Sequence, residues 1–492
     1  MPGGDAYTRR DFLSMLGAAG LTFAAGRPQP NIVYIMADDH ASHAISAYGS
    51  RINQTPNIDR IAQSGIRLNN CFCTNSICTP SRAAILTGQY SHKNGVYTLN
   101  DRLDPNRNHV AKELQRAGYQ TAMIGKWHLA SDPTGFDYWN ILPGQGVYYD
   151  PVFINSGQRK KYQGYCTDLI GDFTLEWLKQ RDPKKPFFVM SHHKAPHRPW
   201  QPAPKYQNLF SDRAIPEPDN LFDHYDGKAR SVAAIKMRVG ENMNKTDLKR
   251  EIPSDLHGDD LRKWAYQYYI KDYLRCIQSV DDNVGRLLEY LDTAGIASNT
   301  IVIYTSDQGF FLGDHGWFDK RLMYEESLRM PFLMRYPGVI HAGSVNRDFV
   351  LNIDFAPMFL DYAGVKPPSE MQGRSFRQNV EGHTPRDWRK AMYYRYWMHN
   401  DNDHHVPGHY GIRTDRWKLI YYYGRPLGKS GANPPDTQPE WELYDLRADP
   451  REMKNLYTDP KYSAQVRDLK AQLDKLQREA GDTPDSPAPA TQ

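Results

Sequence analysis

The stretch Asn-Ile-Val-Tyr-Ile-Met-Ala-Asp-Asp-His, residues 31–40, decides the class of fold that this sequence specifies. Its continuous apolar run over residues 32–37 is typical of a strand that is buried on both faces of a sheet. Two acidic residues, Asp38 and Asp39, follow directly where that strand ends. Because open α/β sheets bind ligands beyond the carboxyl ends of their strands, the stretch predicts a buried strand with a polar site at its end.

The same pattern recurs along the chain. Short apolar runs precede polar clusters, and the segments between them have the periodicity of helices. We expect strands at residues 119–124, 187–191 and 300–305, helices beginning near residues 55–57 and 81, and a long amphipathic helix over 261–293. This alternation predicts an α/β fold with helices on both faces of one sheet.

The chain changes character near residue 385. Aromatic-rich runs at residues 391–396, 411–414, 417–423 and 441–444 are separated by turn residues and indicate short strands. An apolar stripe predicts a final helix over 462–480. We therefore expect a catalytic domain at residues 31–383, a smaller C-terminal α+β subdomain with an antiparallel sheet at 384–480, and a disordered tail at 481–492.

The N-terminal residues resemble an export signal. The pair Arg9-Arg10 precedes an apolar run over 13–25 that is too short to span a bilayer, and a break follows at 26–30. We interpret residues 1–30 as a twin-arginine-type signal, the alternative being a buried first helix. The protein is then expected in the periplasm or outside the cell. No later segment is apolar enough for stable insertion into a membrane.

Composition excludes some classes of protein. The chain has 492 residues, of which 40% are hydrophobic and 24% charged, as in ordinary globular proteins. Five cysteines, an odd and small number, argue against a disulfide framework. The net charge of +4 is far from the clustered basicity of a nucleic-acid binder, although it favours anionic substrates.

The motif Cys-Thr-Pro-Ser-Arg at residues 78–82 carries the chemistry. Arg82 lies one helical turn beyond Cys78 on the same face, where a helix N-terminus can also face an anion. By itself the motif is also compatible with an inert cysteine before a proline-initiated helix. It resembles the signature of type I sulfatases, in which a formylglycine-generating enzyme oxidises this cysteine.

The resemblance implies a definite reaction at residue 78. The hydrated aldehyde of formylglycine is a geminal diol, and one of its hydroxyls attacks the sulfur of a sulfate ester. The other hydroxyl then loses its proton and expels sulfate, which restores the aldehyde. A serine could be sulfated in the same way, but it would lack this second hydroxyl.

Four oxygen donors indicate a metal site. Asp38 and Asp39 follow one predicted strand, and Asp307 and Gln308 follow another. Hard oxygen ligands suit Ca²⁺ or Mg²⁺ rather than zinc. The resemblance implies a single Ca²⁺, with Mg²⁺ as the alternative, that also contacts the nucleophile at Cys78. Gln308 stands where most relatives carry Asn, so its amide oxygen reaches the ion on a longer arm.

The remaining catalytic candidates follow from the resemblance. Lys126 binds a sulfate oxygen, and His128 takes the proton from the diol when sulfate leaves. His197 protonates the leaving alcohol as the general acid. Lys320, in the stretch 313–321, contacts sulfate and the leaving oxygen. Together with Arg82 and the ion, the two lysines would stabilise the negative charge of the transition state.

The resemblance covers residues 31 to about 457, nearly the whole chain after the signal. It implies an alkaline-phosphatase-like fold, with a large mixed sheet between helices and a smaller four-stranded C-terminal sheet. Residues 194–200 look most like N-acetylglucosamine-6-sulfatases of bacterial glycan degraders, although sulfatases of uronic acids and algal polysaccharides share much of this segment. Six residues are candidates for contacts with a sulfated carbohydrate: Trp200, Trp397, His404, His405, His409 and Arg413.

Two other functions remain open from the sequence. Phosphonate and phosphodiester hydrolases of the same superfamily also use a formylglycine, and they differ in the ester that they cleave. A non-enzymatic glycan-binding module, in which Cys78 stays a thiol, is the other alternative. The mass of the peptide that contains Cys78 distinguishes this module from an enzyme, because oxidation to formylglycine lowers it.

Overall fold

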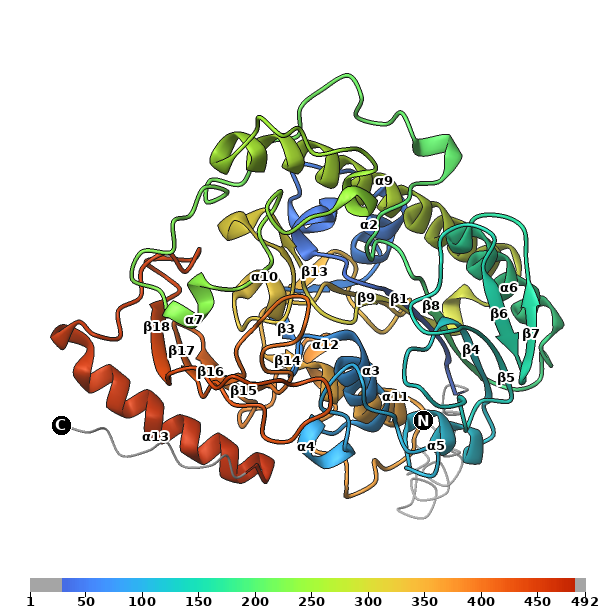
Figure 1. Ribbon diagram of the computed structural model, residues 1–492. Coiled ribbons are helices and arrows are strands. Elements are labelled where there is room, and N and C mark those ends of the chain that lie inside the picture. Colours follow the sequence, from blue (N-terminus) through green and yellow to red (C-terminus); the bar gives the residue numbers. More distant parts are fainter. Residues whose placement is uncertain (1–28, 483–492) are drawn as a thin grey trace, which may run out of the picture.

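A computed structural model of the protein describes residues 29–482. Its centre is a ten-stranded sheet (Figure 1). The strand order is β13 (Ser344–Asn346), β2 (Ile66–Leu68), β12 (Phe332–Arg335), β9 (Thr300–Ser306), β1 (Asn31–Ala37), β8 (Phe187–His192), β4 (Gln120–Lys126), β5 (Tyr138–Leu142), β6 (Val152–Asn155) and β7 (Gln158–Lys161).

The middle of this sheet is parallel and its margins are mixed. β1 pairs in parallel with both β8 and β9, and β4 pairs in parallel with β8 and β5. β12 runs antiparallel to β9, and β6 runs antiparallel to β5. The predicted α/β class and the mixed sheet are therefore confirmed. The four strands expected from apolar runs are present, with ends that differ by one or two residues.

Helices cover both faces of the large sheet. In Figure 1, α2 (Pro56–Gln63), α6 (Cys166–Gln180) and α9 (Gly258–Thr293) lie on one side, and α3 (Cys78–Thr87), α5 (Val110–Arg116) and α11 (Phe355–Tyr362) lie on the other. Alternate residues of β1 point to the two cores. Val33 and Ile35 pack with α6 and α9, whereas Tyr34 and Met36 pack with α3 and α11. This two-sided burial explains why the strand is apolar throughout residues 32–37.

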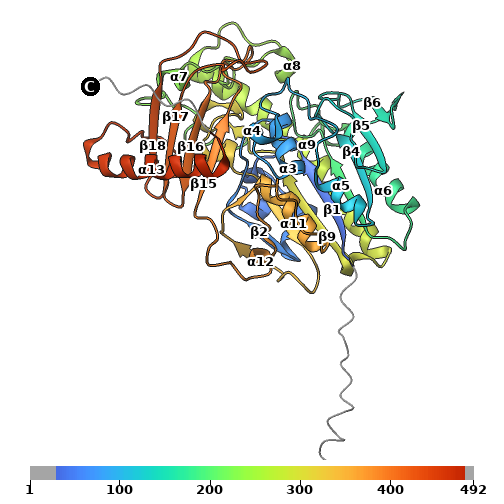
Figure 2. The ribbon, with the colours of Figure 1, turned by 90° about the horizontal axis from the view of Figure 1, so that it is seen from below.

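The C-terminal part forms a second, antiparallel sheet, as predicted. Its order is β15 (Ala391–Tyr396), β16 (His409–Thr414), β17 (Trp417–Tyr422) and β18 (Glu440–Asp445). The last helix, α13 (Ser463–Ala480), lies across the outer face of this sheet (Figure 2). Leu469 and Leu473 of the helix are buried in a core with Ile412 and Leu419 of the sheet.

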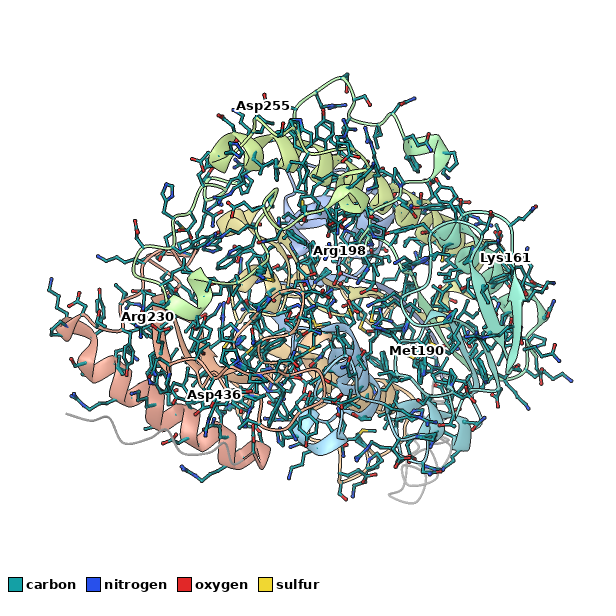
Figure 3. The ribbon with its side chains drawn as sticks, in the orientation of Figure 1. Lys161, Met190, Arg198, Arg230, Asp255 and Asp436 are labelled. Atoms are coloured by element: carbon teal, nitrogen blue, oxygen red, sulfur yellow. The ribbon has the colours of Figure 1, made fainter. Side chains whose placement is uncertain are left out.

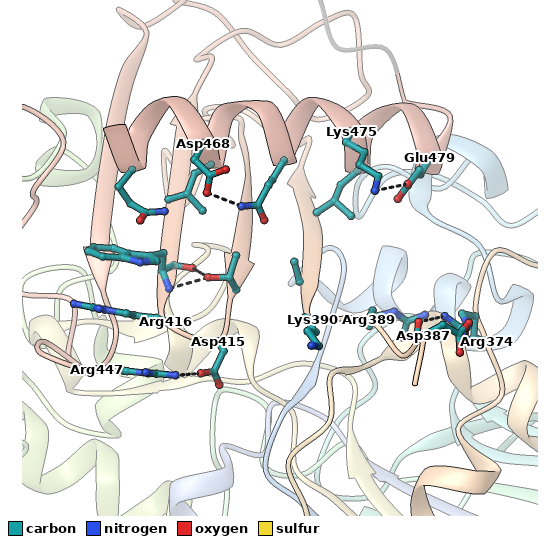
Figure 4. A pocket seen from close by; sticks show the side chains of 17 residues that line it. Arg374, Asp387, Arg389, Lys390, Asp415, Arg416, Arg447, Asp468, Lys475 and Glu479 are labelled. Carbon is teal, nitrogen blue, oxygen red and sulfur yellow. Dashed lines mark hydrogen bonds and ion pairs between the residues drawn. The ribbon is translucent and has the colours of Figure 1, made fainter. Parts of the chain in front are cut away.

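A groove of about 720 Å³ lies between α13 and the C-terminal sheet (Figure 4). Charged side chains along it pair with one another. Arg374 lies 2.8 Å from Asp387, and Lys475 lies 3.7 Å from Glu479. None of the catalytic candidates lines this groove.

Two predictions fall largely or wholly outside the described residues. The expected signal at 1–30 and the expected disordered tail at 481–492 lie almost entirely in residues 1–28 and 483–492. All five cysteines are described, and each is a free thiol, which agrees with the absence of a disulfide framework. Within residues 29–482, every helix is too short or too polar to cross a lipid bilayer.

Candidate active site

The polar clusters of the sequence meet at one edge of the large sheet. Asp38 and Asp39 follow β1, Lys126 is the last residue of β4, and Asp307 follows β9. The parallel pairing of β1 and β9 brings their ends together, and the amide of Asp39 donates a hydrogen bond to Oδ1 of Asp307 over 3.2 Å. Strand order therefore gathers side chains that are up to 269 positions apart in sequence.

Cys78 begins helix α3 beside this edge. The preceding residue, Ile77, has extended backbone, and Pro80 falls in the first turn, where proline is tolerated. The Cys78 side chain is 1% exposed, and its Sγ lies 3.5 Å from Oδ1 of Asp38. Burial, and next the Asp38 carboxylate, raise the pKa of the Cys78 thiol to about 12. An unmodified Cys78 therefore stays a protonated thiol near neutral pH, and such a thiol is a poor nucleophile.

Arg82 ties helix α3 to the ends of two strands. Its Nε and one terminal nitrogen each lie 2.9 Å from Oδ2 of Asp307. Another terminal nitrogen donates to the backbone carbonyl of Lys126. Burial opposes the charge, but Asp307 and Asp38 raise the pKa of Arg82 above its ordinary value. The guanidinium is fixed in place by both carboxylates, with Cys78 one helical turn away.

Three buried carboxylates form the centre of the cluster. Asp38, Asp39 and Asp307 each offer an oxygen, and these oxygens lie within 4.8 Å of one another. Burial raises the pKa of Asp39 to about 6, and burial together with Asp38 raises that of Asp307 to about 7. Burial acts in the same direction on Asp38, but Lys126 outweighs it and holds the pKa of Asp38 well below its usual range.

Lysine ammonium groups neutralise the same carboxylates. Lys126 donates to Oδ2 of Asp38, and the Nζ of Lys320 lies 2.7 Å from each oxygen of Asp39. Two lysines and Arg82 thus balance three carboxylates.

The donor set fits a hard cation. Gln308 donates through Nε2 to Oδ1 of Asp39, and its Oε1 is buried without a hydrogen-bond partner. A buried polar atom without a partner is costly, so this oxygen is available as a ligand to an ion. That amide oxygen lies beside three carboxylates, and together they supply only oxygen donors. Such a set suits Ca²⁺ or Mg²⁺ better than zinc.

Two histidines border the cluster. The Nδ1 of His197 donates to the carbonyl of Arg198 over 2.7 Å, and its Nε2 faces Oδ2 of Asp39 at 3.7 Å. Figure 3 labels Arg198 near the middle of the molecule. The site-facing Nε2 is the atom of His197 that can exchange a proton. Burial first, and then Lys126, lower the pKa of both His197 and His128, which keeps the His128 imidazole neutral and able to accept a proton.

Two predicted carbohydrate contacts are fully buried among aromatic side chains. Trp200 is 0% exposed, and its ring packs against Tyr269 and Phe318 at centroid distances of 4.6 and 6.3 Å. His409 is also 0% exposed and stacks on the rings of Tyr394 and Tyr396. Both rings pack against other protein side chains. Direct sugar contacts of Trp200 and His409 stay predictions, because Asp38 and Lys126 of the cluster are buried to the same degree.

Two further candidates have their polar or aromatic groups engaged by protein. Arg413 forms a two-pronged pair with Glu325 at 3.2 and 3.1 Å. The Arg395 guanidinium covers the ring of Trp397 at 3.5 Å. The structure offers neither Arg413 nor Trp397 as a free surface for a sugar.

The last two candidates lie in the loop between β15 and β16. His405 is partly buried, and its Nδ1 lies 2.8 Å from Oδ1 of Asn400. His404 is 5% exposed, and its ring nitrogens face two carboxylates, Asp401 at 2.8 Å and Asp319 at 3.4 Å. His404 therefore contacts acidic protein groups, and one of them belongs to the stretch that contains Lys320.

The sequence analysis missed the two neighbours of Lys320. Asp319 and Arg321 are 3% and 4% exposed, and they interact with each other at 3.3 Å. The available signal was the run Asp-Lys-Arg at 319–321, directly after two aromatic residues. Gln145, which accepts a hydrogen bond from Lys126, carried no signal because it lies in a loop without a motif.

Family comparison agrees with this geometry. The sulfatase family model matches residues 30–365, and the model of the C-terminal region of N-sulphoglucosamine sulphohydrolase matches residues 313–479. The chain belongs to the sulfatase family, and it is a sulfuric ester hydrolase.

Individual relatives point in the same direction. An N-acetylglucosamine-6-O-sulfatase of Bacteroides thetaiotaomicron is 45% identical over 92% of this chain and 87% of its own length. The solved structure of BT4656 in complex with its substrate D-glucosamine-2-N,6-O-disulfate has a TM-score of 0.87 and 44% identity, and it covers 92% of this chain and 98% of that one. A phosphonate monoester hydrolase of Agrobacterium radiobacter shares the fold, with a TM-score of 0.72, 21% identity, and coverage of 92% of this chain and 96% of that one.

Proposed function

We propose that this sulfatase removes the 6-O-sulfate of N-acetylglucosamine in sulfated glycans. The observation that carries the substrate is the 45% identity, over 92% of the chain, to an N-acetylglucosamine-6-O-sulfatase. A relative of 44% identity that was solved with a 6-O-sulfated glucosamine adds support. Relatives that act on other sulfated polymers, such as an ulvan-active sulfatase at 28% identity, are more distant.

Cys78 is assigned as the precursor of the nucleophile. When a formylglycine-generating enzyme has oxidised it, residue 78 supplies an oxygen nucleophile that the buried thiol lacks. This assignment is supported by the position of Cys78 at the start of α3, with its Sγ 3.5 Å from Oδ1 of Asp38. Arg82 is fixed one turn away, where it holds the group at residue 78 and faces the same anion.

The carboxylates and Gln308 are assigned as the metal ligands. Asp38, Asp39, Asp307 and the orphaned Oε1 of Gln308 would hold one Ca²⁺, with Mg²⁺ as the alternative. The oxidised residue 78 completes the set. The ion supplies positive charge against the sulfate oxygens.

Two lysines are assigned to stabilise the negative charge of the sulfate group, and two histidines are assigned to transfer protons. Lys126 lies against Asp38, and Lys320 lies against Asp39. Both ammonium groups would turn to the oxygens of the sulfate group when substrate binds. His197 would take up a proton at Nε2 when the anionic ester raises its pKa, and would then deliver that proton to the leaving sugar oxygen. His128, kept neutral by burial and by Lys126, accepts the proton that is released from residue 78 when sulfate leaves.

Organisation and location complete the proposal. Residues 31–383 carry the catalytic groups, and residues 384–480 form the C-terminal subdomain. Residues 1–30 direct export by the twin-arginine route to the periplasm or beyond. That route carries folded proteins, so Cys78 can be oxidised before export.

Sulfate release from a panel of positional isomers tests the substrate. N-acetylglucosamine carrying a 6-O-sulfate should be cleaved, whereas the 3-O-sulfated isomer and an N-sulfated sugar should be cleaved far more slowly. A sulfated uronic acid, an ulvan oligosaccharide and a phosphonate ester belong on the same panel. Faster turnover of any of these by protein with oxidised Cys78 would refute the assignment to the 6-sulfated amino sugar.

A further inference from the structure

One of the proposed metal ligands has an unusual backbone conformation. Asp39 has a φ angle of 68°, in the left-handed region that residues other than glycine rarely adopt. Along an extended chain, two successive side chains point to opposite sides. Asp38 and Asp39 nevertheless offer oxygens to one cluster, within 4.8 Å of each other. The left-handed turn at Asp39, directly after strand β1, therefore brings both carboxylates to the same place.

Such a conformation costs conformational free energy and persists only where the surrounding structure enforces it. The hydroxyl of Tyr273, on helix α9, is the group that closes this turn. It donates to the backbone carbonyl of Asp39 over 2.7 Å, and it accepts the backbone amide of Ala41 over 2.8 Å. A single phenol, as donor and acceptor at once, thus joins the backbone on both sides of the residue between them.

The Tyr273 side chain is itself fixed. It is 0% exposed, and its ring stacks on that of Phe310 with a centroid distance of 5.7 Å and an interplanar angle of 12°. The residue lies well inside the long helix α9. The hydroxyl is therefore presented to the turn from a packed ring on a regular helix.

The position of the Asp39 carboxylate matters to several partners. Its Oδ1 accepts a hydrogen bond from Gln308, and both of its oxygens lie 2.7 Å from the Nζ of Lys320. An oxygen ligand of Ca²⁺ has to lie about 2.3–2.6 Å from the ion. A turn that relaxed toward an ordinary φ angle would move this carboxylate away from the other ligands.

We infer that Tyr273 is a positioning residue for the metal site, which holds Asp39 in its left-handed turn and thereby sets the affinity for the ion. The inference rests on the proposed role of Asp39 as a metal ligand. Tyr273 acts through the backbone of Asp39 and Ala41, and not through a bond to the ion. Groups that orient a metal ligand in this way commonly control affinity as strongly as the ligands themselves.

Tyr273→Phe tests this inference, with Tyr269→Phe as the matched control. Phenylalanine keeps the ring that stacks on Phe310 and removes only the hydroxyl. Tyr269 lies one turn earlier on α9 and is also 0% exposed, and its hydroxyl donates to a different backbone carbonyl, that of Phe311, over 2.9 Å. Both variants therefore lose one buried hydroxyl from the same helix, and only one of these hydroxyls contacts the turn at Asp39.

Titration calorimetry with Ca²⁺, on chelator-treated protein with oxidised Cys78, gives the Kd. We expect Tyr273→Phe to raise the Kd roughly 10-fold to 100-fold. Tyr269→Phe should stay within about twofold of the parent protein, because it leaves the ligands in place. The Ca²⁺ concentration that gives half of the maximal rate on a small aryl sulfate should shift in the same way. At saturating Ca²⁺, kcat of Tyr273→Phe should return to the value of the control.

Two outcomes would overturn the inference while the metal site stands. One is a Kd of Tyr273→Phe equal to that of Tyr269→Phe, and the other is a loss of activity that saturating Ca²⁺ does not restore. If Tyr273→Phe unfolds without metal, the rise of its Tm with Ca²⁺ concentration gives the same Kd. A parent protein that binds neither Ca²⁺ nor Mg²⁺ would refute the proposed metal site, and this inference with it.

Discussion

The Nζ atom of Lys320 lies 2.7 Å from both carboxylate oxygens of Asp39, and the pair is almost completely buried. Burial opposes the charge of Lys320, but Asp39 and the neighbouring acids hold its pKa well above the ordinary value. A buried ammonium that remains charged at every physiological pH is suited to stabilise an anionic transition state.

Lys320→Met should therefore lower kcat strongly. Methionine has a similar length but no charge, and loss of one preorganised donor costs roughly 10²-fold to 10³-fold. Steady-state kinetics on an aryl sulfate measures this, and the exposed Lys263 of helix α9, changed to Met, is the control. Equal activity of the two variants would remove Lys320 from the catalytic groups.

His197→Ala should separate good from poor leaving groups. A sugar alkoxide needs a proton to leave, whereas a nitrophenolate does not, so the loss in kcat should be about 10²-fold or more on the sugar and much smaller on the aryl ester. The ratio of the two losses is the measurement. Equal losses on both esters would show that His197 is not the general acid.

Binding of a divalent cation should stabilise the protein. An ion that binds the folded state at 100 times its Kd adds about 2.7 kcal/mol to the free energy of unfolding. Thermal melts after chelation, and then with Ca²⁺ or Mg²⁺ restored, measure this effect. Ca²⁺ should raise Tm more than Mg²⁺, and Asp307→Asn should abolish the rise. A Tm that responds to neither ion in the parent protein would contradict the metal site.

His409 predicts a pH dependence of stability. Burial lowers the pKa of His409 to about 4, below the ordinary value of 6.5. The unfolded chain therefore takes up a proton before the folded protein does. Stability is complete above pH 6.5, and it falls as the pH drops toward 4. At pH 5 the loss attributable to this residue is about 2 kcal/mol.

His409→Phe tests that dependence. The phenyl ring can occupy the same space against Tyr394 and Tyr396, but it cannot take up a proton. Its Tm should fall less than that of the parent protein between pH 7 and pH 5. His257→Phe, at an exposed site directly before helix α9, is the control and should leave the difference unchanged. An equal acid sensitivity of the His409 variant would refute the account.

The sequence predicted what repeats along the chain. Strands such as β1 and β9 carry continuous apolar runs, over residues 32–37 and 301–304, because both of their faces are buried, and these runs made them visible in the sequence. The edge strand β7 has four exposed polar residues, Gln-Arg-Lys-Lys, and gives no such signal. Its pairing is set by the neighbouring β6, which a local pattern does not reveal.

The site residues also differ in how visible they were in the sequence. Groups at strand ends, such as Asp38, Lys126 and Asp307, were found because topology brings strand ends together. The candidates for sugar contacts rested on residue type and on their place beside the catalytic histidine or in a loop of the C-terminal subdomain, and aromatic rings such as Trp200 serve packing as readily as binding. The sequence did not reveal that Asp319 lies beside His404, because the two are 85 positions apart and approach each other through the docking of the C-terminal subdomain.

The measurement that tests the central claim most directly is sulfate release from 6-sulfated N-acetylglucosamine. The protein is co-expressed with a formylglycine-generating enzyme, oxidation of Cys78 is verified by peptide mass, and Cys78→Ala is the control. The account predicts rapid release by the oxidised protein and none by Cys78→Ala, with the two proteins melting at similar temperatures. Release that is equal in both proteins, or absent from protein with verified oxidation, would contradict it.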